Sequence, residues 1–338
     1  MTDAAVLTDT TPYPGQEWKP VAAPEALGWS GERLSRAWDY AESIGSLAVM
    51  VVTKGSALAR WGEVERPFNC RSIRKSLLSS LYGIHVGEGH LALASTLADL
   101  GIDDTEPALS EEEKQATVED LLVSRSGVYH PSNYQPLADR ARLPARGSHA
   151  PGTFWYYNNW DFNALGTIFE RCTQTRIFEE FERRIAQPLQ MQDYRVEEMR
   201  YGYQEHSIHP VYSFRISARD LARYGLLYLR RGRWRARQVV PGAWVETSTR
   251  THALTHSQTG AGFGYLWWTC INGNLFHGLP LPEGSYASYG MGGQFLLVIP
   301  ARDLVVVHMG NPDDPAYRQP TTAQLCRLME LILEASGG

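Results

Sequence analysis

A serine and a lysine one helical turn apart are the first residues whose types and spacing could do chemistry. Ser72 and Lys75 lie in the run RSIRKSLLSSL, residues 71–81. Side chains three positions apart share one face of a helix, so the lysine amine can approach the serine hydroxyl. A hydroxyl becomes a good nucleophile when a neighbouring base takes its proton, and burial lets a lysine amine lose its charge and act as that base. The pair predicts a Ser72 nucleophile activated by Lys75, although a capping serine followed by a solvated lysine fits the same pattern.

A tyrosine and an asparagine two positions apart form the second candidate. Tyr157 and Asn159 lie in the aromatic run PGTFWYYNNW, residues 151–160. A phenol in an electropositive pocket can exchange protons with the serine oxygen and the leaving group, while an amide can bond both the lysine and a substrate carbonyl. Trp155 of the same run could form a pocket wall. The alternative is an aromatic loop that packs on the core.

A glycine-rich stretch that enters an apolar run is the third candidate. The segment 285–300 has the sequence SYASYGMGGQFLLVIP. Glycines there would let a substrate lie against a strand edge and receive a backbone N–H as an oxyanion donor. An ordinary hairpin turn explains the glycines equally well. The candidate substrate-binding residues of this stretch are Tyr289, Gly290, Gly292, Gly293 and Gln294.

The histidines and cysteines give no clear metal-ligand spacing. Only His206 and His209 approach one, and they lack a third ligand nearby, so we predict neither a metal nor a cofactor. His130 flanks a long loop that should overlie the site, where it could contact substrate. The four cysteines lie far apart along the chain and are interpreted as packing residues.

The three candidates occur in the order and rough spacing of the serine β-lactamase and penicillin-binding-protein superfamily. The chain most resembles the class C β-lactamase-related esterases, amidases and 6-aminohexanoate-dimer hydrolases, from about Trp29 to Gly310. This resemblance implies an α+β fold of the β-lactamase/transpeptidase type, with an antiparallel sheet flanked by helices and an inserted, mostly helical domain. It also implies four site residues: the nucleophile Ser72, its base partner Lys75, the second proton carrier Tyr157, and Asn159 as a contact to substrate and lysine.

The third element departs from the family pattern. β-Lactamases usually carry Lys-Thr-Gly or a histidine-containing variant there, whereas this chain has ASYGMGGQ, without a cation. The missing charge normally helps to hold a substrate carboxylate, so fast hydrolysis of penicillin-like acids is not expected. Tyr289 or Gln294 could supply neutral hydrogen bonds instead. A deacylating glutamate motif of the class A kind is also lacking, which leaves Tyr157 and Lys75 to activate the water.

Periodicity indicates the elements that must position these residues. Apolar residues at three-to-four spacing predict helices over 30–43, 72–86, 91–100, 111–124, 163–185, 217–230 and 322–334. Strand-like runs cover 47–53, 57–61, 264–270, 294–299 and 304–308. Strands near both ends around a helical middle predict one sheet built from both chain ends. The expected parts are an N-terminal arm (1–20), a sheet lobe (21–75 and 205–338) and an inserted helical lobe (76–204), with the active site between the lobes.

Composition narrows the class of partner. The net charge of -5 over 338 residues gives no strong field toward nucleic acid or an anionic membrane, so a small-molecule substrate is expected. No apolar stretch approaches the roughly 18 residues of a membrane span. Residues 1–20 lack the basic start and apolar run of a secretory signal, which predicts a cytoplasmic protein. The sequence does not indicate an oligomeric state.

These observations predict a serine hydrolase that cleaves an amide or ester of a small molecule through an acyl-enzyme on Ser72. An acyltransferase of a biosynthetic pathway would use the same acyl-enzyme, so it is the first alternative. The second alternative is a non-catalytic binding protein that keeps the fold.

Overall fold

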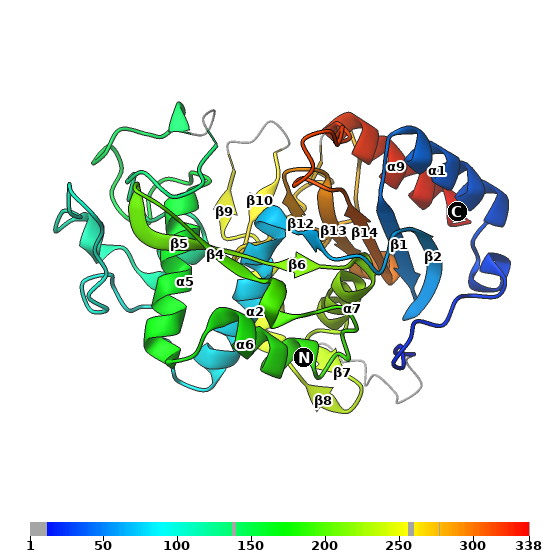
Figure 1. The fold of residues 1–338 in the computed structure, drawn as a ribbon, viewed down its shortest axis with the longest axis horizontal. Coiled ribbons are helices and arrows are strands. Elements are labelled where there is room, and N and C mark those ends of the chain that lie inside the picture. The colour runs from blue at the N-terminus through cyan, green and yellow to red at the C-terminus, as the bar shows by residue number, and fades with distance from the viewer. Residues whose placement is uncertain (1–11, 137–139, 256–259, 277, 338) are drawn as a thin grey trace.

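The computed structural model describes residues 12–136, 140–255, 260–276 and 278–337, and its core is an eight-stranded antiparallel sheet (Figure 1). The strand order is β2-β1-β14-β13-β12-β11-β10-β9, so the first two strands lie beside the last one. The strands are β1 (Ala48–Thr53), β2 (Ser56–Gly62), β9 (Ala253–Leu254), β10 (Gly262–Phe263), β11 (Trp268–Thr269), β12 (Tyr286–Gly290), β13 (Gln294–Ile299) and β14 (Leu304–Met309).

The central strands are buried along their whole length. Every residue of β1, β13 and β14 is buried, and Val51 of β1 pairs with Val306 of β14. Continuous apolar runs of this kind are typical of strands covered on both faces. The confirmed fold class is therefore α+β, with an antiparallel sheet flanked by helices.

Three helices cover the central strands. Helix α1 (Gly31–Ser43) packs against α9 (Thr322–Ala335) on one side of the sheet, and α7 (Ala218–Leu229) contacts β1, β13 and β14 from the other (Figure 1). Each begins at a side-chain cap, because Ser30, Thr321 and Ser217 accept hydrogen bonds from the first turn. The sequence predictions for these three helices are confirmed.

The middle of the chain supplies the helices around the candidate site. A short 3₁₀ turn (Arg71–Ile73) leads into α2 (Arg74–Gly87), and α5 lies alongside the β4–β5 hairpin (Figure 1). The remaining helices and strands here are α3 (Val118–Leu122), α5 (Asn159–Thr173), α6 (Ile177–Phe181), α8 (Gly242–Ser248), β3 (Phe68–Asn69), β4 (Arg200–Gln204), β5 (Ser207–Ser213), β6 (Arg215–Ile216), β7 (Arg233–Trp234) and β8 (Arg237–Gln238). Short 3₁₀ turns lie at Pro24–Leu27, Glu113–Gln115, Val196–Glu198 and Pro300–Arg302, and a π-turn at Glu182–Ala186.

Two predicted helices are wrong in part or in whole. The segment 91–100 forms turns, because Thr96 and Asp99 bond each other's backbone N–H groups and so compete with helix formation. The helix predicted over 163–185 begins earlier, at Asn159, and is interrupted at Gln174, whose φ of 55° is left-handed.

Two further elements are shorter than predicted. The helix over 111–124 is divided, because a capping box between Thr117 and Asp120 starts α3 anew. The strand over 264–270 shrinks to β11, since Leu266 has a φ of 65° and turns the chain.

The proposed lobe boundaries stay a prediction. The β4–β5 hairpin spans the boundary placed between residues 204 and 205, and it packs on α5 of the predicted helical lobe. Residues 1–11 of the predicted N-terminal arm lie outside the described residues. In the described ranges, no helix combines the length and apolar character required to cross a bilayer.

Candidate active site

The side chains of Ser72, Lys75 and Tyr157 meet at one point. Lys75 Nζ donates hydrogen bonds to Ser72 Oγ at 2.8 Å and to Tyr157 Oη at 2.6 Å. A longer bond of 3.4 Å reaches Asn159 Oδ1. The first and last of these four residues, Ser72 and Asn159, are 87 positions apart along the chain. The fold brings all four together around the Lys75 amine, which contacts both hydroxyls.

The backbone bends sharply just before Ser72. Arg71 has a φ of 51°, a left-handed conformation that costs a non-glycine residue about 1 kcal/mol or more. Hydrogen bonds hold it there: Arg71 N donates to Asn69 Oδ1 at 3.1 Å, and Arg71 Nη2 donates to Pro312 O at 2.8 Å. This anchored bend places Ser72 in the 3₁₀ turn at the entrance to α2.

The two hydroxyl groups and the amine differ in exposure. Ser72 and Tyr157 are half-buried, whereas Lys75 is only 3% exposed. Lys75 Nζ also lies 4.5 Å from the ring centroids of both Tyr157 and Phe162. A substrate can therefore reach Ser72 from solvent while the amine lies beneath it, against two aromatic rings.

A cap at the start of α5 fixes the loop that carries Tyr157. Asn158 accepts a bond from Trp160 N at 3.2 Å and donates from Nδ2 to Val128 O at 2.6 Å. Ser124 binds the same loop on its other side, because its Oγ donates to Tyr156 O at 2.6 Å and accepts from Asn158 N at 3.0 Å. These positioning residues were not predicted from the sequence, although an asparagine just before an apolar helix is a capping signal.

Asp161 supports this cap from inside the core. Its Oδ1 accepts hydrogen bonds from Ser126 Oγ at 2.5 Å and from Asn158 Nδ2 at 2.8 Å. Complete burial raises the pKa of the Asp161 carboxyl well above its usual range. The neutral form is therefore favoured, and Asp161 can stabilise the loop without adding a full negative charge behind Tyr157.

Aromatic rings form a stacked wall beside the amine. Trp268 of β11 stacks on Tyr157 at 5.7 Å and on Tyr289 at 4.9 Å, and Trp155 meets it edge-on at 5.9 Å. Burial raises the pKa of Tyr289, so its hydroxyl is neutral. Trp155 and Tyr289 were candidate substrate-binding residues, whereas Trp268 was missed because the sequence indicated only a strand over 264–270.

Gly290 lies directly against the backbone of the candidate nucleophile. A Cβ atom at this position would lie 2.7 Å from Cys70 O and 2.8 Å from Ser72 N, which real Cβ contacts do not tolerate. Only glycine lets the end of β12 approach so closely. The backbone nitrogen of Ser72 consequently lies beside the end of β12.

The rest of the glycine-rich stretch forms the turn between β12 and β13. Gly292 and Gly293 have φ values of 94° and 80°, and Gly292 lies against Pro312. Gln294 was predicted to bond substrate, but its amide donates to Gly310 O at 2.9 Å and accepts from Gly310 N at 3.3 Å. The Gln294 side chain therefore bonds the backbone of the protein and does not make the substrate contact that we expected.

His130 is also engaged away from the assembled site. It is 2% exposed, and its ring nitrogens lie 2.9 Å from Pro131 O and 3.1 Å from Thr105 O. Both ring nitrogens of His130 are therefore occupied by backbone oxygens, so the ring does not make the substrate contact that we expected. The reason is that the ring is turned into the core beside Asp104, at 3.5 Å, rather than toward the loop surface.

The glycine-rich stretch 285–300 contains no lysine, arginine or histidine. Ser288 of β12 is buried, and its Oγ accepts a hydrogen bond from Ser76 Oγ at 2.7 Å. Arg71 lies close to this edge, but it pairs with Asp313 at 3.1 Å. Within the described part of the chain, the one group of metal-ligand geometry lies elsewhere, at residues 85–90.

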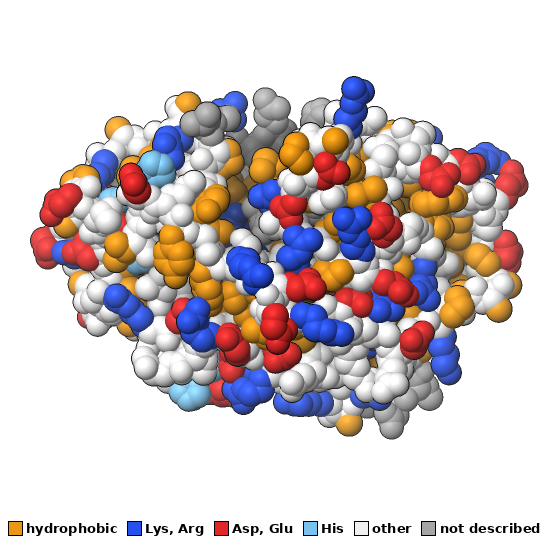
Figure 2. All heavy atoms as spheres, in the orientation of Figure 1, with side chains coloured by type: hydrophobic (Ala, Val, Ile, Leu, Met, Phe, Trp, Pro, Cys, Tyr) orange, Lys and Arg blue, Asp and Glu red, His pale blue; other side chains and the backbone are white. Residues whose placement is uncertain are grey.

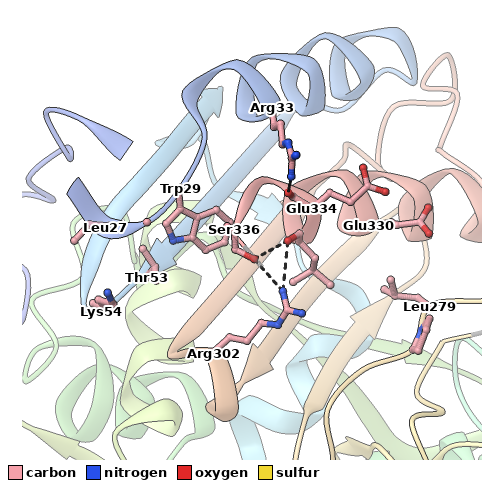
Figure 3. A pocket seen from close by; sticks show the side chains of 14 residues that line it. Leu27, Trp29, Arg33, Thr53, Lys54, Leu279, Arg302, Glu330, Glu334 and Ser336 are labelled. Carbon is pink, nitrogen blue, oxygen red and sulfur yellow. Dashed lines mark hydrogen bonds between the residues drawn. The ribbon is translucent and has the colours of Figure 1, made fainter. Parts of the chain in front are cut away.

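Two hollows of the surface can be compared. Figure 2 shows one in the middle of its face, between the part with α5 and the part with the large sheet. A cavity of about 780 Å³ lies beside α1 and α9, where Arg302 donates to Ser336 Oγ and Arg33 to Glu334 O (Figure 3). None of the predicted catalytic residues is in its described lining.

Comparisons with known proteins identify the family of this chain. The beta-lactamase family model matches residues 32–326, which is most of the chain. No curated protein sequence matches it significantly.

Solved structures share the fold over nearly the whole chain. A protein described as a 6-aminohexanoate-dimer hydrolase of Bacillus anthracis has a TM-score of 0.68 at 18% identity, covering 95% of this chain and 86% of its own. A penicillin-binding-protein homologue of Caulobacter crescentus has 0.66 at 16% identity, with coverages of 91% and 99%. EstCE1, described as a hydrolase with promiscuous acyltransferase activity, has 0.63 at 14% identity, with coverages of 92% and 100%. The chain belongs to the beta-lactamase family.

Proposed function

We propose that this chain is a serine hydrolase that cleaves an amide or ester of a small molecule through an acyl-enzyme on Ser72. One observation carries the proposal: a buried amine, Lys75 Nζ, lies within hydrogen-bonding distance of both Ser72 Oγ and Tyr157 Oη. An amine in that place can take the proton of one hydroxyl while it communicates with the other.

The reaction follows from this arrangement. Ser72 Oγ attacks the substrate carbonyl and its proton passes to Lys75 Nζ. Tyr157 Oη then delivers a proton to the leaving alcohol or amine and is reprotonated from Lys75. Water attacks the resulting ester, loses a proton to the same relay, and releases the acid as Ser72 Oγ regains its proton. The N–H of Ser72 would stabilise the oxyanion in both halves.

The walls of the site favour a neutral substrate. The stack of Tyr157, Trp268 and Tyr289 offers apolar surface, and the glycine-rich stretch 285–300 contains no lysine, arginine or histidine that could hold a substrate carboxylate. A linear amide or ester with an apolar or planar part fits this lining better than a carboxylate-bearing β-lactam. The fold neighbour described as a 6-aminohexanoate-dimer hydrolase supports an amide substrate. A cytoplasmic location is part of the proposal, and the four free cysteines support it.

A fluorophosphonate probe tests the nucleophile. Wild-type protein should be labelled covalently, and Ser72→Ala should abolish labelling because the attacking oxygen is gone. Ser43→Ala, which removes an exposed hydroxyl of α1, is the control and should be labelled like wild type. Undiminished labelling of Ser72→Ala would defeat the assignment.

Acyl transfer is the second candidate function. The fold neighbour EstCE1 is described as having acyltransferase activity, and transfer needs only an amine or alcohol in place of water. Amines supplied together with a p-nitrophenyl ester should give condensed product by mass spectrometry if transfer competes with hydrolysis. Complete absence of probe labelling in wild-type protein would instead favour the non-catalytic alternative, which the assembled Ser72, Lys75 and Tyr157 argue against.

A further inference from the structure

Two histidines and a glutamate converge at the C-terminal end of α2, the opposite end from Ser72. His85 Nδ1 lies 3.0 Å from His90 Nδ1 and 4.0 Å from Glu88 Oε2, and His90 Nδ1 lies 3.6 Å from Glu88 Oε2. A tetrahedral Zn²⁺ site with bonds of about 2.0–2.1 Å separates its ligand atoms by roughly 3.3 Å. The three separations bracket that value, so one ion could contact all three atoms after small side-chain shifts.

A C-terminal helix cap holds the three residues together. Gly89 N donates to Val86 O at 3.1 Å and His90 N donates to His85 O at 2.9 Å, the two bonds of a Schellman motif. Gly89 has the left-handed φ of 79° that this motif requires. The turn therefore folds His90 back over His85, so backbone geometry preorganises the ligands.

Outer partners orient the ligand atoms as in metal sites. His85 Nε2 lies 2.9 Å from Glu180 Oε1, and Glu180 is 2% exposed. A proton shared with that carboxylate leaves the Nδ1 lone pair directed at His90 and Glu88. Arg184 donates to both carboxylate oxygens of Glu88, from Nη2 to Oε1 and from Nη1 to Oε2 at 3.2 Å, and this pairing holds Oε2 beside the histidines.

Charge and access also suit a cation. The C-terminal end of a helix carries partial negative charge, which favours a cation. The carboxylates of Glu88 and Glu180 are balanced in charge by Arg183 and Arg184. The side chains of His90 and Glu88 are 55% and 38% exposed, so an ion can enter from solvent and keep a water ligand. His85, 4% exposed at its side chain, forms the buried floor.

We propose that His85, Glu88 and His90 bind one divalent transition-metal ion of the Zn²⁺ class, with Glu180 as a positioning residue. Imidazole and carboxylate together suit Zn²⁺ and its neighbours better than Ca²⁺ or Mg²⁺, which prefer oxygen ligands alone. The bound ion would stabilise the end of α2 and its contact with α6.

Calorimetric titration of the tag-free, chelator-stripped full chain with ZnCl₂ tests the site. We expect one Zn²⁺ per chain and a rise in Tm with added Zn²⁺. His90→Ala should weaken binding by more than the ~10–100-fold typical of losing an outer partner, and Glu180→Gln should weaken it within that range. His206→Ala, on the β4–β5 hairpin, is the control and should bind like wild type.

Two results would overturn the site. One is stripped wild-type protein that binds no Zn²⁺ and shows no change in Tm. The other is His90→Ala that binds Zn²⁺ as tightly as wild type, which would place the ion elsewhere. Because His90 is exposed and lies after the end of α2, its substitution should leave the fold intact.

Discussion

At the scale of single residues, the chemistry depends on what surrounds one amine. Lys75 is buried beneath two half-buried hydroxyls and faces the rings of Tyr157 and Phe162. Its amine is within hydrogen-bonding distance of both hydroxyls, so in our proposal the same side chain takes a proton from Ser72 and returns it through Tyr157. The two hydroxyls differ in their proposed use: one attacks, and the other carries the proton to the leaving group.

Removing either proton carrier should slow turnover while leaving the fold intact. We expect Lys75→Ala and Tyr157→Phe each to lower kcat/KM for a p-nitrophenyl ester by ~10² to 10⁴, the usual contribution of a positioned acid or base. Tyr156→Phe, one position away, should stay near wild type. Equal rates in Tyr157→Phe and Tyr156→Phe would show that the phenol of residue 157 moves no proton.

The sequence could indicate the proton carriers but not every neighbour. Ser72 and Lys75 share a helix face because their spacing is local, and so the pattern alone placed them together. Whether a polar side chain faces the substrate depends on long-range packing. The Gln294 amide bonds the backbone of Gly310, and the His130 ring bonds backbone oxygens of its own surroundings. Local sequence patterns do not reveal such partners.

At the scale of elements, the approach of β12 to the start of α2 shapes the site. Gly290 at the end of that strand lies against Ser72 N, so the strand edge and the nucleophile form one surface. A substrate lying along β12 would have its carbonyl beside both the attacking oxygen and a backbone donor. The glycine-rich stretch 285–300 therefore does more than connect two strands, because Gly290 also packs against the start of α2.

A single methyl group on this strand should disturb catalysis. Gly290→Ala would place its Cβ 2.8 Å from Ser72 N and push that donor aside. Loss of one oxyanion donor costs about 10²–10³ in kcat, and we expect a fall of that order in steady-state kinetics. Gly242→Ala, whose Cβ would meet its nearest heavy atom at 3.5 Å, is the matched control. Unchanged kcat in Gly290→Ala would separate the strand from the chemistry.

His308 of β14 ties the glycine turn to the sheet and should make stability depend on pH. Its Nδ1 donates to Gly293 O at 2.6 Å, and burial lowers the pKa of His308 to about 4 from an ordinary value of 6.5. Because the folded-state pKa is depressed, this stabilisation is complete above pH 6.5 and is lost as pH falls toward 4. At about 1.4 kcal/mol per pKa unit, it amounts to roughly 3 kcal/mol.

Urea unfolding between pH 7 and 4 measures this effect. His308→Asn keeps an amide that can donate to Gly293 O but cannot titrate, so its free energy of unfolding should fall less steeply with acid than that of wild type. His209 contributes to the pH dependence that remains, because burial also lowers the pKa of His209 to about 4. Identical slopes for His308→Asn and wild type would refute the contribution of His308.

Periodicity predicted the long elements and failed where side chains compete with the backbone. Helices α1, α7 and α9 combine a capping residue with an apolar stripe, and both signals are local. The segment 91–100 has apolar spacing too, but its Thr96 and Asp99 side chains favour a turn. Strand β11 was overestimated because the left-handed turn at Leu266 has no sequence signature.

At the scale of the whole molecule, both chain ends complete one sheet. Strand β1 pairs with β14, and α1 packs on α9, so elements more than 250 residues apart share one core (Figure 1). The run of strands at both ends made this arrangement predictable, and the fold class is confirmed. The order β11-β10-β9 at the far edge was not predicted, since these two-residue strands are too short to show a period.

Because both chain ends contribute to this one core, we expect the active site and the chain ends to unfold together. Leu328→Ala in α9 removes a fully buried side chain and should cost about 2–5 kcal/mol. Circular dichroism and probe labelling should then be lost at the same, lower temperature. Arg327→Ala, next to it but 46% exposed at its side chain, should change stability by ~0.5 kcal/mol or less. Two separate transitions in Leu328→Ala would contradict a shared core.

The acylated residue can be identified directly by mass spectrometry of wild-type protein that is quenched during turnover of a p-nitrophenyl ester, followed by fragmentation of the peptide that contains residues 71–75. We expect Ser72 alone to carry the acyl mass. An acyl group found on another residue, or ester turnover that continues unchanged in Ser72→Ala, would contradict it.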